Sequence, residues 1–290
     1  MPSRIAIGTA QFGLPYGVAN NSGQISRDVA AGILEHAWNS GVDMLDTAVA
    51  YGESEIRLGD LGVRQWKVVT KLPALPEKCP DISAWVFNTV SASLQRLNIE
   101  RLYGLLMHNP SQLSSRQGPG LYKALLGVKD QGLVSNIGVS IYDPIELETI
   151  CNQYDVDIVQ APLNIVDRRL ITSGWMVKLH DRGIEVHARS IFLQGLLLMT
   201  YGSRNPAFDR WASLWQNWRD WLRVENLTPL QACLGFVLAH AEISRVVIGI
   251  DSLAHFQEIL TTADYKVADT PNDLACNDIN LINPSRWTLK

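Results

Sequence analysis

Short runs of apolar and β-branched residues alternate along this chain with longer segments in which apolar side chains recur every three or four positions. Such alternation is typical of repeated βα units around a parallel sheet. Eight runs qualify as strands, and each is followed by a segment of helical period, which predicts a closed (β/α)8 TIM barrel. The expected strands are residues 5–9, 43–46, 68–71, 103–108, 136–140, 158–161, 184–189 and 246–249.

The expected helices carry both termination signals and apolar faces. Glycine follows three of them, as Gly41, Gly132 and Gly183, where a left-handed residue after the last turn favours glycine. No linker, low-complexity tract or change of composition divides the chain, so we expect one domain over residues 1–290. The two clearest apolar faces are formed by Val29, Ile33, Leu34 and Ala37 and by Val86, Val90, Leu94 and Leu97.

One segment, residues 199–226, interrupts the alternation as an insert after the seventh strand. Trp211, Trp215, Trp218 and Trp221 recur at a spacing that places them on one face of a helix. Such a stripe most often packs a helix against the rest of the barrel. The alternative is a lid over an active site, because the loops after barrel strands commonly carry specificity.

The composition excludes several classes of protein. With 47% hydrophobic and 19% charged residues and a net charge of −4, the chain lacks the basic field expected for nucleic-acid binding. The N-terminal residues lead into a strand without the apolar core of a signal peptide, and no stretch approaches the roughly 18 apolar residues of a membrane span. We therefore expect a cytoplasmic protein with no membrane or nucleic-acid partner. Neither CxxC pairs nor metal-ligand spacing occur, so we expect reduced structural thiols and no metal site at Cys79, Cys151, Cys233 and Cys276.

Four residues with complementary proton chemistry follow three neighbouring strands: Asp46, Tyr51, Lys71 and His108. Tyrosine holds its proton to about pH 10, so it acts as an acid near neutrality only where a cation stabilises the phenolate. Lys71 could be that cation, Asp46 could keep the lysine charged, and His108 could hydrogen-bond a substrate oxygen. Each residue alone has an ordinary structural interpretation, but a TIM barrel brings the C-terminal ends of its strands to one site.

A proton donor of this kind needs a partner that delivers hydride. If Tyr51 protonates a carbonyl oxygen, a cofactor must reduce the carbon, because side chains cannot. The residues therefore predict a nicotinamide cofactor. No GxGxxG motif follows an expected strand, so a Rossmann-type site is not expected.

From about residue 5 to residue 260 the chain resembles the aldo-keto reductase superfamily, and DTAVAYGESE is similar to the family signature D-T-A-x-x-Y-G-x-S-E. The resemblance implies a barrel whose mouth holds an extended NADP(H) or NAD(H). It implies that Tyr51 is the general acid in carbonyl reduction and the base in alcohol oxidation. Lys71 and Asp46 would tune the pKa of Tyr51, and His108 would orient the carbonyl of a small aldehyde, ketone or sugar.

The positions that hold the cofactor in the family match less closely. Ser140 and Gln160 correspond to groups that grip the carboxamide, but Ile141 replaces an asparagine. Arg189 stands where the family has an aromatic ring stacked on the nicotinamide; its guanidinium can stack, while its charge disfavours the oxidised ring. The following LQGLL is similar to a loop that closes over the pyrophosphate, with Gly195 allowing the backbone to approach phosphate.

The segment VVIGIDSLAHFQEIL is similar to the last cofactor element of the family, with which Gly249, Ser252 and Glu258 align. Family members that prefer NADPH place lysine or arginine here, whereas this chain has Asp251 and His255. A carboxylate repels a 2′-phosphate, which favours NAD(H). Ser252 could offer helix N–H groups to an anion, although residues of this type are also ordinary helix caps. Use of either cofactor stays open.

Two interpretations follow. The first is an oxidoreductase that moves hydride between a nicotinamide and a carbonyl or alcohol. The second, suggested by Ile141 and Arg189, is a cofactor-binding or regulatory relative with negligible turnover, or a site that carries out non-redox chemistry. The sequence sets no expectation for the oligomeric state or for the physiological substrate.

Overall fold

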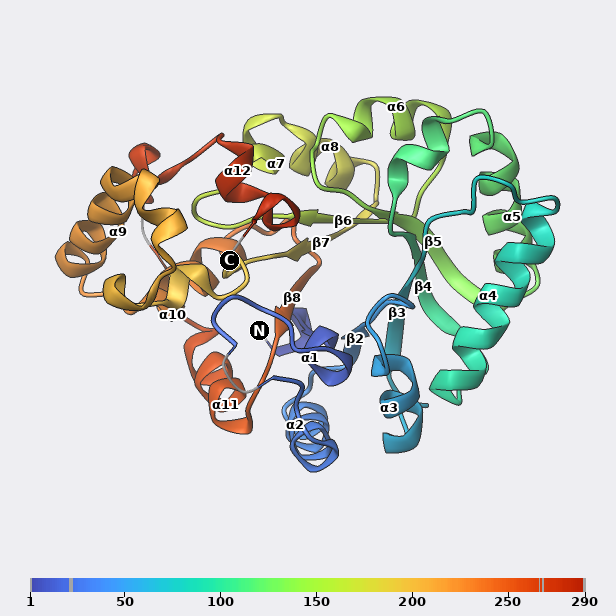
Figure 1. Ribbon diagram of the computed structural model, residues 1–290, viewed down its shortest axis with the longest axis horizontal. Helices are drawn as coiled ribbons and strands as arrows, with labels where there is room; N and C mark the ends of the chain where they lie inside the picture. The colour runs from blue at the N-terminus through green and yellow to red at the C-terminus, as the bar shows by residue number, and fades with distance from the viewer. Residues whose placement is uncertain (1, 21–22, 266, 268, 289–290) are drawn as a thin grey trace.

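Eight parallel strands pair in chain order, and β8 closes on β1, in the computed structural model of the protein (Figure 1). The structure describes residues 2–20, 23–265, 267 and 269–288. The closed parallel barrel confirms the (β/α)8 architecture expected from the alternation of the sequence. The strands are β1 Ile5–Gly8, β2 Met44–Asp46, β3 Lys67–Leu72, β4 Leu102–Met107, β5 Val134–Ser140, β6 Ile158–Pro162, β7 Glu185–Arg189 and β8 Arg245–Gly249.

Helices alternate with these strands and surround the barrel (Figure 1). Gly41, Gly132 and Gly183 all adopt positive φ just beyond helices α2, α5 and α8, as expected for the ends of those helices. The helices are α1 Ala10–Gly13, α2 Arg27–Asn39, α3 Ser54–Leu61, α4 Ile82–Leu97, α5 Gly118–Asp130, α6 Glu146–Gln153, α7 Arg169–Thr172, α8 Trp175–Asp181, α9 Ala212–Val224, α10 Pro229–Leu238, α11 Leu253–Thr262 and α12 Ile279–Ile282.

One of the two expected helix faces is confirmed in full and the other in part. All four apolar residues expected on one face of α4 are buried. On α2, Val29 is 39% exposed, and Ala30 faces the core in its place. The remaining α2 residues expected to be buried, Ile33, Leu34 and Ala37, are buried.

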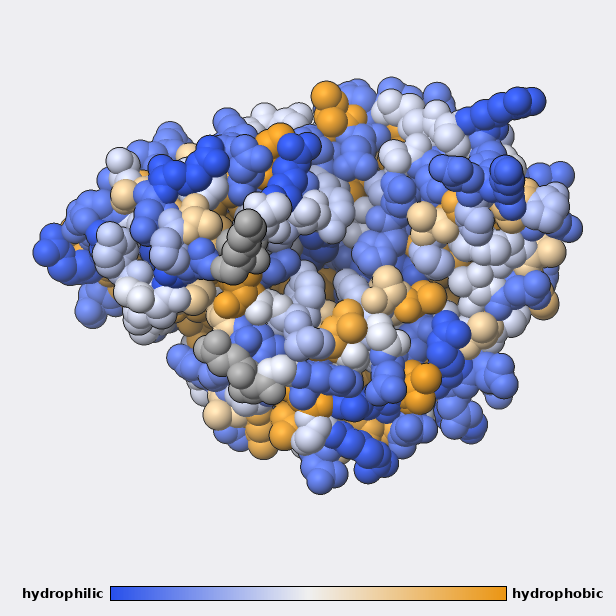
Figure 2. All heavy atoms as spheres, viewed as in Figure 1, coloured by the Kyte–Doolittle hydropathy of each residue, from blue (hydrophilic) through white to orange (hydrophobic). Residues whose placement is uncertain are grey.

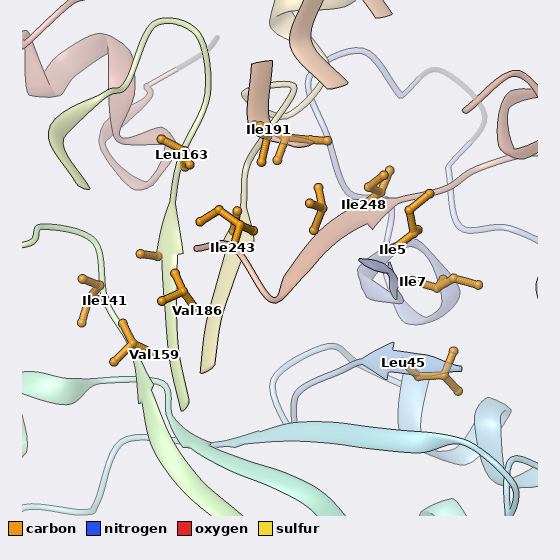
Figure 3. Close-up of a cluster of buried hydrophobic side chains, with 14 of the residues drawn as sticks. Ile5, Ile7, Leu45, Ile141, Val159, Leu163, Val186, Ile191, Ile243 and Ile248 are labelled. Atoms are coloured by element: carbon orange, nitrogen blue, oxygen red, sulfur yellow. The ribbon is translucent and has the colours of Figure 1, made fainter. Parts of the chain in front are cut away.

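Two apolar clusters hold the barrel rigid. The larger includes branched side chains from several strands, among them Ile7, Leu45 and Val159 (Figure 3). Each fully buried aliphatic or aromatic side chain contributes roughly 1.5–3 kcal/mol to folding. The smaller cluster consists of Ala6, Met44, Val69, Leu106, Ile158 and Val247.

The register of the strands sets which polar side chains meet at the C-terminal end of the barrel. Asp46 lies opposite Val69, so Lys71 is two residues further along β3 and points to the same side. Ser140 at the end of β5 lies opposite Gln160 on β6. Strand pairing therefore brings together residues that are far apart in the sequence.

The expected insert after β7 contains short 3-10 turns and α9, which lies at the outer edge of the molecule in Figure 1. Trp215, Trp218 and Trp221 are buried, and the indole N–H of Trp215 donates to Phe208 O at 2.8 Å. The indole N–H of Trp211 donates to Asp278 Oδ2 at 3.1 Å, which ties the insert to the C-terminal segment.

All four cysteines are free thiols, and burial raises the pKa of the Cys233 thiol. Within the part of the chain that the structure describes, no helix is long and apolar enough to cross a membrane. In the same residues no group of three or more histidine, cysteine, aspartate or glutamate side chains is arranged to hold a metal ion.

Candidate active site

A cavity of about 720 Å³ opens where the C-terminal ends of the strands meet. The face of the molecule shown in Figure 2 is hollowed near its centre. The cavity is lined at one end by three of the four residues expected to carry out the chemistry, and Lys71 lies buried beneath them. Nine of the expected site residues line it: Asp46, Tyr51, His108, Ser140, Gln160, Arg189, Gly195, Gly249 and Glu258.

Lys71 and Asp46 form a buried ion pair. Lys71 Nζ lies 2.7 Å from Asp46 Oδ2 and donates to Thr47 O at 2.9 Å, and its side chain is 1% exposed. Burial lowers the pKa of Lys71, and the charge of Asp46 opposes this shift. The other carboxylate oxygen, Oδ1, accepts a hydrogen bond from Gln160 Nε2 at 2.6 Å. Both oxygens of Asp46 are therefore engaged, which fixes the position of the ammonium.

Tyr51 and His108 lie next to this pair. Their ring centroids are 6.1 Å apart in an edge-to-face arrangement, and Lys71 Nζ is 5.1 Å from the centroid of the Tyr51 ring. Burial lowers the pKa of His108 to about 4, assisted by the charges of Lys71 and Arg189. His108 is therefore a neutral imidazole at pH 7 and can donate one hydrogen bond through its N–H.

The expected stabilisation of the Tyr51 phenolate by Lys71 stays a prediction, and the protonated phenol is favoured in this structure. Burial, followed by the charge of Asp46, raises the pKa of Tyr51, and the cation that opposes them is Arg189. The negative charge of Asp46 therefore acts on the phenol even though Asp46 is paired with Lys71. Tyr51 keeps its proton at neutral pH.

The signature DTAVAYGESE has structural as well as chemical roles. Ser54 Oγ donates to Thr9 O at 2.9 Å and lies 3.1 Å from Thr47 Oγ1, which joins the start of α3 to β1 and β2. Gly52 has a φ of +56°, and a Cβ at this position would lie 2.5 Å from Gly13 O. The segment thus holds Tyr51 in a turn that is tightly packed against the loop after β1.

Glu55, the last residue of the signature, supports the scaffold without lining the cavity. Its buried carboxylate accepts hydrogen bonds from Thr70 Oγ1 at 2.6 Å and from Arg96 Nε at 2.8 Å. These bonds connect α3 to β3 and α4 and leave the carboxylate fully paired.

The expected carboxamide-binding residues lie together at the ends of β5 and β6. Ser140 Oγ donates to Gln160 Oε1 at 3.3 Å, so Gln160 links Ser140 to Asp46. The Ile141 side chain is fully buried in the apolar cluster of Figure 3. Ile141 contacts the other site residues through its backbone. Its N–H donates to Gln160 O at 2.9 Å, and its carbonyl accepts from Arg189 Nη2 at 2.8 Å.

Arg189, at the end of β7, has neutral surroundings. Its guanidinium lies over the ring of Tyr142, 4.4 Å from the ring centroid, and Nη1 donates to Ser190 Oγ at 3.2 Å. Its Nε is buried and has no hydrogen-bond partner among the described residues. Tyr142 also lines the cavity and was not expected from the sequence, where an aromatic residue in a loop carries no signal of its own.

The loop after β7 brings backbone to the cavity in a strained conformation. Ser190, Leu193 and Gln194 have φ values of 58°, 49° and 55°, which non-glycine residues rarely adopt. Gly195 has a φ of 88°, and a Cβ there would lie 2.6 Å from Ala19 Cβ. Strain of this kind is concentrated at ligand-binding segments.

The far end of the cavity is formed by β8 and the start of α11. Asp251 Oδ1 and His255 Nδ1 are 2.5 Å apart. Ser252 does not line the cavity; its Oγ accepts a hydrogen bond from His255 N at 3.2 Å, so it caps the helix. Glu258 lines the cavity, as does Gln11, whose buried Oε1 has no partner among the described residues.

The tryptophans of the insert do not line the cavity. Leu198 and Met199, where the insert begins, do line it. Trp215, Trp218 and Trp221 of α9 are instead buried in the larger apolar cluster, which favours the packing interpretation over a lid. Arg168, which precedes α7, donates to Ile165 O at 2.9 Å and to Pro271 O at 2.7 Å.

A closed parallel barrel with a tyrosine, a lysine–aspartate pair and a histidine at its C-terminal end defines a class of barrel oxidoreductases. The model of the aldo/keto reductase family matches residues 4–271, and the chain belongs to this family. It is 25% identical over 315 residues to D-threo-aldose 1-dehydrogenase from a Pseudomonas species, a match that covers 94% of each chain.

Two solved structures share the fold. An aldo-keto reductase from Bacillus halodurans, in its holo form, is similar with a TM-score of 0.71 and 18% identity over 92% of this chain and 88% of that one. A Pseudomonas aeruginosa protein proposed to be an aldo-keto reductase is similar with a TM-score of 0.66 and 22% identity over 90% and 89% of the two chains.

Proposed function

We propose that this protein is an NAD(P)(H)-dependent oxidoreductase that reduces the carbonyl group of an aldehyde, ketone or sugar to an alcohol, or catalyses the reverse reaction. The observation that carries the proposal is the cluster at one end of the cavity: Tyr51 and neutral His108 above the buried Lys71–Asp46 pair. These groups can donate to a carbonyl oxygen from two sides and stabilise the charge that forms there.

Each residue has a distinct task in this proposal. The His108 N–H orients the carbonyl oxygen through a hydrogen bond, and Tyr51 transfers its phenolic proton to that oxygen as the carbon is reduced. Lys71, held by Asp46, lies close enough to stabilise the phenolate that remains. In alcohol oxidation the Tyr51 phenolate accepts the proton of the alcohol. The positive charge of Lys71 stabilises the phenolate that this step requires.

The cavity fits an extended dinucleotide. When bound, a reduced nicotinamide supplies the hydride that the side chains cannot provide. Ser140 and Gln160 lie at the catalytic end and would hold the carboxamide end, while the strained loop at Gly195 offers backbone to the phosphates. The buried polar atoms without partners, Arg189 Nε and Gln11 Oε1, lie in this same cavity and are suited to a polar ligand.

The charge at the far end of the cavity favours NAD(H) over NADP(H). Asp251 and Glu258 line that end, and a carboxylate there repels a 2′-phosphate while it can accept a hydrogen bond from a 2′-hydroxyl. The similarity to an aldose dehydrogenase supports a sugar or sugar-derived carbonyl as the substrate class.

Oxidation of NADH or NADPH with a panel of aldehydes, ketones and sugars tests the proposal. Replacement of Tyr51 by phenylalanine should reduce turnover by about 100-fold or more and leave cofactor binding intact. Tyr265→Phe, which changes an exposed tyrosine, is the matched control and should retain full activity. Activity that survives Tyr51→Phe would contradict the role of Tyr51, and cofactor binding without turnover of any carbonyl would favour the regulatory interpretation.

A further inference from the structure

Arg189 is a cation at the catalytic end of the cavity without an ion-pair partner among the described residues. Its guanidinium is held by an aromatic face, a carbonyl and a hydroxyl, all of which are neutral. A partly buried charge without a counterion is costly, since burial removes water without providing an opposite charge.

The other ionisable groups at this end do not balance that charge. Asp46 is neutralised by Lys71, and His108 is neutral at pH 7. Arg189 lines the same cavity as Tyr51 and His108, the groups expected to contact the substrate, and its positive charge favours the phenolate of Tyr51 and the neutral form of His108. The catalytic end therefore carries a net positive charge, whereas the acidic residues of the cavity, Asp251 and Glu258, lie at its far end.

Arg189 also retains hydrogen-bonding capacity. A guanidinium has five N–H groups, and two of them are used, by Ile141 O and Ser190 Oγ. The remaining donors, with the stacking of the group on Tyr142, leave a fixed and oriented cation beside the substrate space. This is the arrangement by which arginine recognises carboxylates and phosphates.

We propose that the carbonyl substrate carries an acidic group, a carboxylate or a phosphate, that pairs with Arg189. This inference rests on the proposed function for the identity of the reacting carbonyl, but the binding of the acid can be measured without any reaction. It narrows the substrate class from neutral aldehydes and sugars to their acidic derivatives, such as aldehyde acids or sugar acids and phosphates.

Equilibrium binding provides the first test. Isothermal titration of the full-length protein, with and without NADH, compares benzoate and phenyl phosphate with neutral benzamide. A charge-assisted pair with Arg189 should make one of the two anions bind about 10- to 100-fold more tightly than benzamide. Which anion binds better distinguishes a carboxylate from a phosphate.

Three variants assign the effect to this residue. Arg189→Met should abolish the preference for the anion, and Arg189→Lys, which keeps the charge but loses the planar fork, should retain part of it. Arg223→Met removes an exposed arginine of α9 and should leave the preference unchanged. Circular dichroism establishes whether each variant is folded. If Arg189→Met does not fold, Arg189→Lys still tests whether the planar guanidinium is needed for the preference.

Turnover provides a second, separable test. Glyoxylate, succinate semialdehyde and 4-formylbenzoate are each compared with their methyl esters in the presence of NADH or NADPH. The wild-type protein should prefer at least one acid over its ester by about tenfold or more in kcat/KM, and Arg189→Met should remove that preference.

The outcomes separate the two proposals. Turnover of the esters and acids at equal rates, with no selective binding of either anion, would overturn the acidic-substrate inference while leaving the reductase function intact. Selective binding of an anion without any turnover would support the acid site and contradict the proposed reaction. If Arg189→Met weakens all nicotinamide cofactors equally and the wild type shows no anion preference, Arg189 holds the pyrophosphate and the inference is wrong.

Discussion

Replacement of Asp46 by asparagine would leave the ammonium of Lys71 buried without its counterion. Lys71 Nζ and Asp46 Oδ2 are 2.7 Å apart, and both side chains are almost fully excluded from solvent. At an effective dielectric constant of about 20, unit charges at that separation attract each other by about 6 kcal/mol. Asparagine would also present an N–H group toward one of two donors, Lys71 or Gln160, and lose that hydrogen bond.

Lys71 can limit this loss by releasing its proton. From an ordinary pKa of 10.5, neutralising a lysine at pH 7 costs about 5 kcal/mol, which sets an upper bound. Removal of one partner of a buried pair commonly costs about 3–5 kcal/mol. We therefore expect Asp46→Asn to lower the free energy of unfolding by about 3–5 kcal/mol.

Urea denaturation of the four members of a double-mutant cycle measures this coupling. Lys71→Met alone leaves a buried carboxylate that keeps only Gln160 as a donor, so it should also destabilise the protein. The Asp46→Asn/Lys71→Met double variant removes both charges and should be more stable than the sum of the single losses predicts.

The pH dependence of the free energy of unfolding shows whether Lys71 causes the loss of stability in Asp46→Asn. Burial already lowers the pKa of Lys71 in the wild-type protein, and loss of the opposing Asp46 charge should lower it further in Asp46→Asn, whereas the unfolded value stays near 10.5. The unfolded state therefore binds more protons in this window, and stability should rise as the pH rises toward 10.5. The double variant should lack this rise. Additive losses below about 1 kcal/mol, or the same rise in the double variant, would refute the reasoning.

Three further predictions concern neighbouring groups. Because the pKa of His108 falls from 6.5 to about 4 on folding, the native state should lose stability as the pH falls through this range, and His108→Gln should lose less; identical acid unfolding curves would contradict this. Asp251→Asn should tighten NADPH binding several-fold and change NADH binding little, as measured by titration; equal changes for both cofactors would exclude a role in selecting the 2′-group. A Cβ at Gly13 would collide with the Tyr51 carbonyl, so Gly13→Ala should lower the free energy of unfolding by about 3 kcal/mol and reduce turnover; a stable, fully active variant would show that this turn can move.

Much of the fold could be predicted because the positions of its strands and helices follow from the order of apolar and polar residues close together in the sequence. Alternating strands and helices, glycines after helices and the apolar face of α4 depend on neighbouring residues, and all of these predictions were confirmed. Val29 was expected in the core of α2, but periodicity leaves a helix face uncertain by about one residue, and Ala30 lies there instead. Tertiary packing, which the sequence pattern does not encode, determines that choice.

The candidate site was predictable in its residue types but not in its contacts. The ends of the strands placed Asp46 and Lys71 together, as expected from a barrel. The hydrogen bond from Gln160 to Asp46 joins residues on strands that are not neighbours in the barrel, so it depends on how side chains cross the interior. The raised pKa of Tyr51 likewise depends on burial and on the whole charge distribution, which a sequence does not display.

The proposed oxidoreductase function requires that the protein bind a nicotinamide cofactor. The protein contains nine tryptophans, whose fluorescence can be followed as NADH or NADPH is added, with NAD⁺ and NADP⁺ measured by displacement of the reduced form. We predict saturable binding of NADH, weaker binding of NADPH because of Asp251, and weaker binding of each oxidised form because of Arg189. Absence of binding to all four forms would contradict the proposed oxidoreductase function.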